Sequence, residues 1–571
     1  MKKKKFVAFL SLLLAISMLA ACGSTPESVR TNEKTAALTV AEARKELDSL
    51  LTKVSVATIK DPKLDIYTDE ISEAAALASI DTFKLPVEGN GQVNIEIAAA
   101  TELSSESPDD WIIAVARNFN REGNQINGKS VSVTIRTITS GEILTYLQAG
   151  IYQPNGAIFS SDAWGRMADA SGIGIKLFEQ RIAGNTAGIL ISKSANDKIK
   201  AEYNEVTFAT VIQAAQDGMI VFGYTNPYTS STGLNGLATM LEIFDPTDPL
   251  SSKASQTLAN YQKSAPPVAY TTAVLRNQAK KGIVDAMVME EQAYVNTPEL
   301  SDYIYIPFGI RHDHPVYGFD WNSADENEAL RLFIDYCLSS ENQKLATSKG
   351  FNKHDDYRGE SGLTGQQYLT AQSMWKQNKN GGRPVAAVFI ADISGSMNGE
   401  PIASLKESVI ATLPYIGSEN YVGLISYSSD VTINVSMLET DRDGNPTAVK
   451  PFDDRQRAYF SGEMKALQAS GNTATYDAIC AGLDMINKAQ SLVPDAVPLI
   501  ILLTDGACNS GYSLSRVSTI VEGMRVPVYC IAYNYDGGEL ESLSGINEAS
   551  TVKADTDDVV NQLRNLFNTQ L

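Results

Sequence analysis

The sequence predicts an α/β protein with two compact units, and two observations carry this prediction. From about residue 93 to 352, and again from residue 383 onward, β-rich runs alternate with amphipathic helical patterns, which is typical of layered folds with parallel sheets. Some of these runs, such as PVAAVFIAD at 384–392, are apolar on both faces, as a central parallel strand requires. By length alone, 571 residues suggest three or four compact units, which is enough for both of these regions and their connections.

The N-terminus has the pattern of a secretory signal. Residues 2–5 are lysines, and an apolar run over 6–19 is too short for a comfortable membrane span. The run ends in LAAC, which resembles the lipobox of bacterial lipoproteins. The resemblance implies that residues 1–21 form a signal peptide and that Cys22 carries the lipid. The alternative is an ordinary cleaved signal followed by a chance cysteine.

Residues 22–85 are expected to form a lipidated tether and an amphipathic helical arm. The stretch after Cys22 is small, polar and proline-containing, which suits a flexible tether. AALTVAEARKELDSLLTKVSV at 36–56 has a helical pattern and is interpreted as a stalk or a packing arm.

Charge and cysteine content narrow the functional classes. The formal net charge of the whole chain is −20, which disfavours nucleic acid and anionic membrane surfaces as partners. The cysteines beyond Cys22 are sparse and show no CxxC spacing, so buried thiols are favoured over a disulfide scaffold, with one bridge left open.

Residues 86–355 are expected to form the first domain, with a strand at 93–99 and another in VSVTIRTI. Between them, SPDDWIIAVARNFN predicts a helix with Ser107 as N-cap and Pro108 at its first position. Asp109 and Asp110 would then lie in its first turn, where acids interact favourably with the helix dipole.

Hydroxyl-rich loops stand directly before several helix starts in this domain. Helix N-termini present free N–H groups and hydroxyls add donors, so such loops suit a carboxylate or oxyanion. Simple capping explains any single loop equally well. The candidate solute-binding residues are Thr101, Ser104, Ser105, Ser140, Ser160, Ser161, Thr229, Ser230 and Ser231.

The order and spacing of several pieces resemble the type II periplasmic solute-binding proteins of bacterial importers, over about residues 90–352. The resemblance implies two lobes, near 90–187 plus 307–352 and near 190–305, with a ligand cleft between them. The pieces that carry it are SSDAW (160–164), AGILISKSA (187–195), TNPYTSSTGLNGL (225–237), GIVDAMVMEEQAYV (282–295), IPFGIRHDHPVYGFDW (306–321) and the closing helical stretch 325–351.

Two motifs in this domain are interpreted as structural. GNQINGKS at 123–130 fits a P-loop pattern, but a helix precedes it and a strand follows, which reverses the P-loop order, so it is interpreted as a Gly-rich connection. HDH at 312–314 lacks the further histidines and cysteines of a metal tract, since His354 is the only other histidine. HExxH and GxSxG are missing, so no enzyme activity is expected.

Residues 356–382 are expected to be a linker and residues 383–571 a second α/β domain. YVGLISYSS and VTINVSML predict two strands, plausibly a hairpin, and a final helix is expected from Thr556.

Acids and hydroxyls stand at the ends of the two most apolar runs of this domain. The strand through Val388 ends on Asp392, with Ser394 and Ser396 at alternating positions, and VPLIILLTDG ends on Asp505. Ligands of open α/β sheets bind outside the carboxyl ends of the strands, so these oxygens are expected to converge there. Hydroxyls, waters and two carboxylates suit a hard cation such as magnesium.

DISGSM, GNTATYDAI (471–479) and LLTDG (502–506) resemble the von Willebrand factor A (VWA) domain, over about residues 380–571. The resemblance implies a Rossmann-like domain with a parallel-dominated sheet and a divalent-cation site (MIDAS). Thr475 is the alternative to Thr473 among its ligands. The implied ion is Mg²⁺, with Mn²⁺ or Ca²⁺ open, and the implied partner is a protein that contributes a carboxylate. The implied metal ligands are Asp392, Ser394, Ser396, Thr473 and Asp505.

These features together predict a lipid-anchored binding protein on the extracytoplasmic face of the cell membrane, with a VWA domain that binds a protein partner through its metal. The alternative is a solute-binding receptor of an ABC-type importer, with the VWA domain as an accessory docking module. A small anionic solute is the candidate ligand of the first domain, and no nucleic-acid partner is expected.

Overall fold

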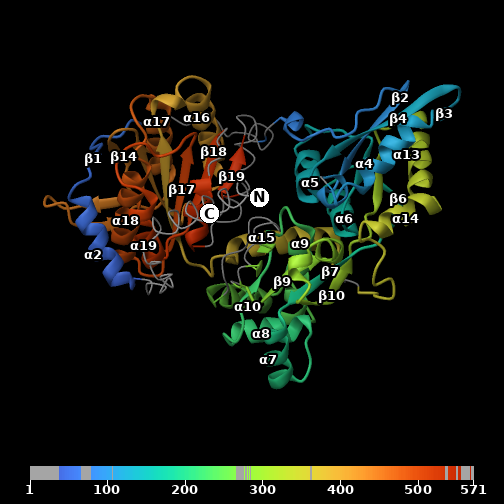
Figure 1. Ribbon diagram of the computed structural model, residues 1–571, viewed down its shortest axis with the longest axis horizontal. Helices are drawn as coiled ribbons and strands as arrows, with labels where there is room; N and C mark the ends of the chain where they lie inside the picture. Colours follow the sequence, from blue (N-terminus) through green and yellow to red (C-terminus); the bar gives the residue numbers. More distant parts are fainter. Residues whose placement is uncertain are drawn as a thin grey trace, which may run out of the picture.

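Three large sheets organise the molecule, which is a mixed α/β structure in this computed structural model (Figure 1). The signal peptide, the tether and Cys22 lie outside the described residues, as does nearly all of the final helix. None of the described helices has the length and apolar character needed to cross a membrane. The structure describes residues 38–65, 77, 79–105, 107–264, 275–276, 279–280, 282, 284–359, 363–533, 538–547, 551–554, 563 and 566.

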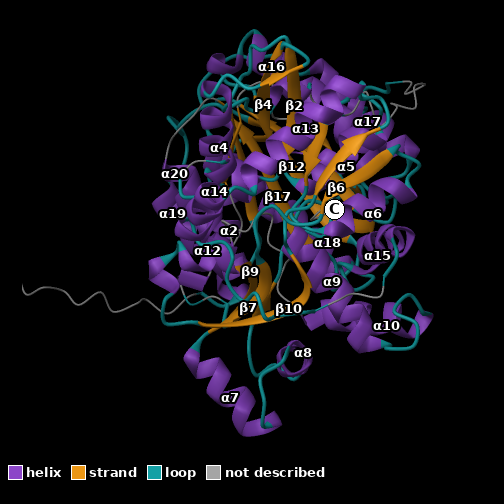
Figure 2. Ribbon diagram, turned by 90° about the vertical axis from the view of Figure 1, so that its right-hand side faces the viewer, coloured by secondary structure: helices purple, strands orange, loops and turns teal. Residues whose placement is uncertain are grey.

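The first lobe is built on a six-stranded sheet of order β3-β4-β2-β5-β11-β6. Its strands are β2 (Val93–Ala99), β3 (Gln125–Ile126), β4 (Lys129–Thr137), β5 (Gly156–Ile158), β6 (Ile175–Glu179) and β11 (Val316–Phe319). Its helices are α3 (Thr101–Ser104), α4 (Trp111–Arg121), α5 (Ser140–Gln148), α6 (Asp162–Ala170), α13 (Ala324–Cys337) and α14 (Ser340–Ser348). Ile95 and Ile97 of β2 pack with α4 and α13, whereas Ala98 packs with α5 and α6 on the opposite face. Figure 2 shows helices around the strands.

The second lobe has a four-stranded sheet of order β10-β7-β9-β8. Its strands are β7 (Thr186–Ile191), β8 (Phe222–Gly223), β9 (Ala286–Glu290) and β10 (Ile304–Arg311). Its helices are α7 (Lys193–Tyr203), α8 (Phe208–Gln216), α9 (Ser231–Phe244), α10 (Ser252–Ser264) and α12 (Glu291–Val295). Every position of β7 and β9 is buried, which explains their continuous apolar sequences.

The chain crosses between the lobes at residues 180–185 and 312–315. The first crossing comes earlier than residues 187–190 and the second later than residue 307, where the sequence placed them. The reason is that β10 stays paired with β7 as far as Arg311, which lies opposite Thr186.

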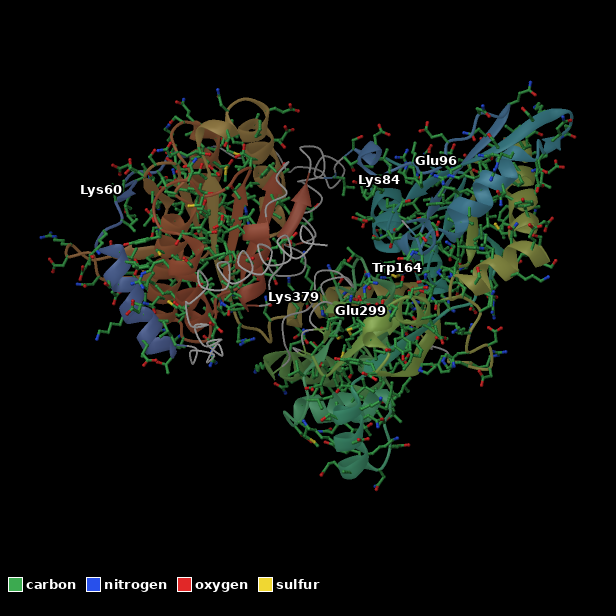
Figure 3. All side chains as sticks on the ribbon, viewed as in Figure 1. Lys60, Lys84, Glu96, Trp164, Glu299 and Lys379 are labelled. Carbon is green, nitrogen blue, oxygen red and sulfur yellow. The ribbon has the colours of Figure 1, made fainter. Side chains whose placement is uncertain are left out.

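Helix α15 (Gly365–Asn378) contacts both lobes, within the stretch that the sequence assigned to a linker. A Cβ on Gly365 would lie 1.9 Å from the carbonyl oxygen of Arg166 in α6, so only glycine permits this approach. At the other end, the indole N–H of Trp375 donates to the Tyr224 hydroxyl in the second lobe, over 2.8 Å. The chain after α15 leads into the third sheet, and Lys379 marks this junction in Figure 3.

The third sheet has seven strands in the order β1-β14-β13-β12-β17-β18-β19. It is parallel except for the antiparallel pair β13–β14, which is the hairpin that the sequence indicated. Its strands are β1 (Val56–Thr58), β12 (Val385–Asp392), β13 (Tyr421–Tyr427), β14 (Val431–Val435), β17 (Val497–Thr504), β18 (Val528–Tyr533) and β19 (Thr551–Ala554). Around it lie α16 (Glu400–Thr412), α17 (Asp454–Ala466), α18 (Thr475–Leu492), α19 (Leu514–Met524), α20 (Gly538–Ser544) and the small hairpin β15 (Leu438–Thr440) to β16 (Pro446–Val449).

The N-terminal arm belongs to this third sheet, although some 320 residues of chain separate it from β12. Helix α2 (Val40–Leu51) starts with a capping box between Thr39 and Glu42 and buries Leu47 in the core shared with α18 and α19. Strand β1 then pairs in parallel with β14 at the sheet edge. Of the two uses that the sequence left open, the described residues therefore show a packing arm (Figure 1).

The P-loop-like stretch is a β-hairpin. Asn127 and Gly128 connect β3 to β4 with φ values of 51° and 77°, as a two-residue type I′ turn requires. Lys129 forms an ion pair of 2.6 Å with Asp325 on the surface. These contacts agree with a structural role for this motif. The sequence predicted a Gly-rich connection from a helix to a strand, whereas the structure has a hairpin with an Asn-Gly turn.

The four described cysteines are free thiols. Cys337, Cys480 and Cys530 are buried, and Cys508 is half-buried. This agrees with the preference for buried thiols over a disulfide scaffold.

Candidate metal and solute sites

Asp392 ends β12 and is completely buried. Its Oδ1 accepts the backbone N–H of Ser394 over 2.8 Å. Its Oδ2 accepts the Thr504 hydroxyl over 2.6 Å and the Tyr427 hydroxyl over 3.2 Å. These three donors come from the loop after β12 and from the two neighbouring strands, so the carboxylate is held in one orientation at the carboxyl end of the sheet.

Two serine hydroxyls connect Asp392 to the second acid. The hydroxyls of Ser394 and Ser396 lie 3.1 Å apart, and Ser396 Oγ donates to Asp505 Oδ1 over 2.8 Å. Ser394 is buried, whereas Ser396 is exposed and Asp505 is half-buried. The structure therefore joins these four residues into one group that opens toward solvent.

Thr473 lies in the adjoining loop. The backbone N–H of Gly395 donates to the Gly471 carbonyl over 3.0 Å, which ties this loop to the serine pair. The Thr473 N–H donates to the Asn509 side chain over 2.8 Å. The rival Thr475 is buried, and its hydroxyl lies 3.3 Å from the Tyr427 hydroxyl, on the inner side of Asp392. Thr473 is also buried, but its loop is tied to the serine pair, whereas the Thr475 hydroxyl is engaged by Tyr427, so Thr473 stays the predicted ligand.

The electrostatics of this group fit a cation. Burial raises the pKa of Asp392, hydrogen bonds from Thr504 and Ser394 oppose that rise, and the charge of Asp505 adds to it. A positive ion beside Asp392 would stabilise its ionised form against this rise. The donor set consists of carboxylate and hydroxyl oxygens, which are the ligands that a hard divalent cation prefers.

Three supporting residues were not singled out from the sequence: Thr504, Tyr427 and Asn509. Thr504 precedes Asp505 in LLTDG, so its place at a strand end was a usable signal. Tyr427 and Asn509 had no such signal, because their contacts with Asp392 and Thr473 join positions far apart in the chain.

A cavity of about 380 Å³ lies between the two lobes of the first domain. Seven of the nine candidate solute-binding residues line it: Thr101, Ser105, Ser140, Ser160, Thr229, Ser230 and Ser231. The other lining residues are Glu102, Asp109, Thr139, Thr232, Arg276, Glu290, Gln292 and Ala293. The lobes meet beside it, where the Trp164 indole N–H, labelled in Figure 3, donates to Ser231 Oγ over 2.7 Å.

The remaining two candidates, Ser104 and Ser161, are not among the lining residues. The Ser104 hydroxyl donates to the carbonyls of Ala99 and Ala100 and so completes the α3 turn. Ser161 is buried at the start of α6. The Ser104 hydroxyl is therefore used in local hydrogen bonds, which is the alternative to solute binding that the sequence left open.

The two histidines of the HDH stretch lie against two glutamates of the cavity wall. His312 Nδ1 lies 2.6 Å from Glu290 Oε1, and His314 Nε2 lies 3.3 Å from Glu102 Oε1. Both imidazoles are fully buried at the crossing between the lobes. They point to different glutamates, which agrees with the structural interpretation of this motif.

Burial and these contacts shift the pKa values of Glu102, Glu290 and His314. Burial raises the pKa of Glu102, but the hydrogen bond and charge of His314 outweigh burial and hold that pKa below its usual value. Burial lowers the pKa of His314, and Glu102 more than reverses this. Burial, followed by the charge of Glu102, raises the pKa of Glu290.

Asp109 was expected in the first turn of a helix that starts at Pro108, and this expectation was wrong. Helix α4 begins at Trp111, with Asp110 as its N-cap. Asp109 instead accepts the Gln292 side-chain N–H over 2.7 Å, which is a contact between the lobes.

Family models match both parts of the chain. A model described as bacterial extracellular solute-binding protein matches residues 101–352, and one described as von Willebrand factor type A domain matches residues 387–569. Over 187 residues the chain is 29% identical to inter-alpha-trypsin inhibitor heavy chain H3 of Mus musculus, covering 30% of this chain and 20% of that protein. It is 25% identical over 177 residues to heavy chain H1 of Sus scrofa, covering 30% and 18%. The chain thus spans a fifth or less of these curated relatives.

Solved structures also share similarity with each part. The chain aligns with a periplasmic thiamin binding protein at 12% identity and a TM-score of 0.38, over 51% of this chain and 99% of that one. It aligns with a von Willebrand factor type A protein from Catenulispora acidiphila at 19% identity and a TM-score of 0.29, over 33% and 42%.

Proposed function

The chain joins a bacterial extracellular solute-binding domain to a von Willebrand factor type A domain, and we propose that it is a lipid-anchored surface protein that binds a protein partner through a divalent cation in the VWA domain. Both matched families are binding domains, which fits a binding protein rather than an enzyme. The proposed anchor is Cys22, because LAAC ends an apolar signal.

The observation that supports metal-dependent binding is the hydrogen-bonded group at the carboxyl ends of β12 and β17. The proposed ligands are Asp392, Ser394, Ser396, Thr473 and Asp505, some of them through water. Magnesium is the preferred ion because it favours oxygen ligands and retains several waters. The two carboxylates would balance the charge of a divalent ion, and the other proposed ligands are neutral oxygens, so the ion would stay electron-poor enough to accept a carboxylate of the partner.

The solvent exposure of Ser396 supports a role toward a partner. Asp392 and Ser394 are buried and fix the inner side of the group, whereas Ser396 and the Asp505 edge face outward. A partner carboxylate therefore has access from the Ser396 side. The partner's identity is left open, and its recognition is proposed to depend on the metal.

Surface cross-linking on intact cells tests this proposal. We expect partner adducts of the wild-type protein to disappear with a chelator, to return with magnesium, and to be missing in Asp392→Asn. Asp302→Asn is a matched control, because Asp302 is an exposed acid of the other domain. Adducts that are equal in wild type and Asp392→Asn, with and without chelator, would contradict metal-dependent binding.

A second candidate function is a solute receptor for an importer, and the cavity between the lobes favours it. Hydroxyl residues from both lobes line the same space of about 380 Å³, within the range of small-molecule sites. In this function the VWA domain is an accessory docking module. Thermal unfolding of the mature chain with a panel of small solutes tests it, since a bound solute stabilises the folded state.

A further inference from the structure

The hydroxyls of the cavity do not determine which charge it accepts. Serine and threonine both donate and accept hydrogen bonds, so Ser140 or Ser230 suits an anion, a cation or a neutral solute. The discriminating groups are the carboxylates and amides of the lining. These are Glu102, Asp109, Glu290, Gln292 and Arg276.

Gln292 supplies a buried acceptor without a donor. Its side chain is completely buried and lines the cavity. Its Nε2 donates to Asp109 Oδ1 over 2.7 Å. The other polar atom of the side chain is the acceptor Oε1. Among the residues that the structure describes, this Oε1 has no hydrogen-bond partner. Buried polar atoms are rarely left unpaired, so a donor from a bound solute is the natural complement.

Carboxylates stand beside this acceptor on both lobes. Asp109 belongs to the first lobe and Glu290 ends β9 of the second. Glu290 accepts from the Asn185 side chain over 3.1 Å and lies 2.6 Å from His312, which fixes its orientation. Each carboxylate oxygen has two acceptor sites, so these contacts leave capacity for a further donor.

The described lining of the cavity has fewer cationic side chains than acidic ones. Arg276 is the one cationic residue among the lining side chains, and it lies close enough to influence Asp109. His314 is committed to Glu102 in the buried ion pair. Burial raises the pKa values of Asp109 and Glu290, and an anionic solute beside them would raise both further, whereas an ammonium would stabilise their ionised forms.

We propose that the cavity between the lobes binds a small solute through an ammonium group, held by Gln292 Oε1, Asp109 and Glu290. This inference rests on the solute-binding part of the proposed function and replaces the anionic solute expected from the sequence. The hydroxyls of α5 and α9 hold the rest of the solute. Because Asp109 and Glu290 come from different lobes, a bound ammonium links them and favours the closed arrangement.

Three four-carbon probes separate charge from size. Putrescine carries an ammonium at each end, 1,4-butanediol a hydroxyl, and succinate a carboxylate. We expect isothermal titration calorimetry on the mature chain, with each probe at up to about 10 mM, to detect putrescine binding and to find butanediol at least tenfold weaker, since each lost charge-assisted contact removes a sizeable part of the affinity. Succinate is expected to give no binding.

Substitution then assigns the binding to the cavity. Asp109→Asn keeps an acceptor for the Gln292 N–H but removes the charge, and we expect it to weaken putrescine at least tenfold. Asp302→Asn, at an exposed position outside the cavity, is expected to leave the affinity unchanged. Circular dichroism of both variants checks that they fold.

Three results would overturn the proposal. Succinate binding that exceeds putrescine binding would leave a working solute site and reject the ammonium. Failure of all three probes at the highest concentration would reject the ammonium proposal, and the thermal-unfolding panel of solutes then shows whether the solute-binding function fails with it. Putrescine binding of equal strength in wild type and Asp109→Asn would also reject the proposed contacts.

Discussion

Ser396 Oγ donates a hydrogen bond to Asp505 Oδ1 over 2.8 Å, between residues 109 positions apart. The contact joins the loop after β12 to the end of β17. Parallel neighbouring strands bring their carboxyl ends to one edge of the sheet, so two motifs that are distant in the sequence meet there. The proposed metal site is a direct consequence of this topology.

Two threonines in GNTATYDAI are expected to behave differently when each is replaced by valine. Thr473→Val should weaken magnesium binding and leave the free energy of unfolding nearly unchanged, because the Thr473 hydroxyl is a proposed ligand and valine has nearly the same shape as threonine. Thr475→Val should destabilise the domain by about 1 kcal/mol through the lost hydrogen bond to Tyr427, with a smaller effect on magnesium. Magnesium titration and urea unfolding measure both effects. The opposite pattern would make Thr475 the ligand.

The N-terminal arm is expected to stabilise the VWA domain. Leu47→Ala removes a buried side chain between α2 and the α18–α19 layer and should cost about 2–5 kcal/mol. Lys45→Ala, at an exposed position of the same helix, is the control and should be close to neutral. Denaturant unfolding of the mature chain measures the difference. Equal stability of the two variants would show that α2 does not stabilise the domain.

The Glu102–His314 pair predicts a pH dependence of stability. His314 has a raised pKa in the folded state, so its contribution is present below its unfolded value of about 6.5 and is lost as pH rises through the folded value. Glu102 has a lowered pKa, so its contribution is present above its unfolded value of 4.5 and is lost as pH falls through the folded value.

The cost of Glu102→Gln should therefore be largest between about pH 4.5 and 6.5, where both partners are ionised in either state, at roughly 3 kcal/mol for a broken buried pair. It should shrink above the folded pKa of His314. Unfolding of wild type and variant from pH 5 to 9 measures this profile. Glu299, labelled in Figure 3, has an exposed carboxylate, so Glu299→Gln is the control. Its cost in unfolding free energy should be small and should not change over this pH range. A flat profile for Glu102→Gln would show that the pair does not stabilise the fold.

The proposed anchor predicts that Cys22→Ala releases the protein from membranes. The reason is that LAAC ends an apolar signal and the proposed lipid on Cys22 would hold the mature chain at the membrane. Fractionation after a high-salt wash measures the distribution, with Cys508→Ala as a control that should stay with the membranes. A Cys22→Ala protein that sediments as wild type does would contradict the anchor.

Much of the fold and of the metal group could be predicted because the signals are local. The apolar run ending at Asp392 and the run ending at Asp505 are single strands, and their ends meet once the strands lie side by side. The hydroxyl loops led to the cavity for a similar reason. Loops at strand ends, such as those with Ser160 and Ser230, gather on the sides of the lobes that face each other.

Other features depend on partners that no local pattern reveals. Strand β1 finds its place at β14, where Val56 lies opposite Val431, and three residues alone carry no signal for that pairing. Asp109 has the sequence context of a helix start, and its contact with Gln292 spans 183 positions. The sequence prediction of an anionic solute and the proposed ammonium differ for this reason, since the hydroxyls were visible in the sequence and the carboxylates and amide around the cavity were not recognised there as one group.

The most direct test of the central claim is calorimetric titration of magnesium into the mature chain and into its Asp392→Asn variant. The variant keeps the size of the side chain and removes a charge, so the account predicts one magnesium bound by wild type and an affinity at least tenfold lower in the variant, with the fold intact because the group lies at the rim of the sheet. Ser396→Ala should lose less, since water can replace an exposed hydroxyl. Equal magnesium affinity in wild type and Asp392→Asn would contradict the account.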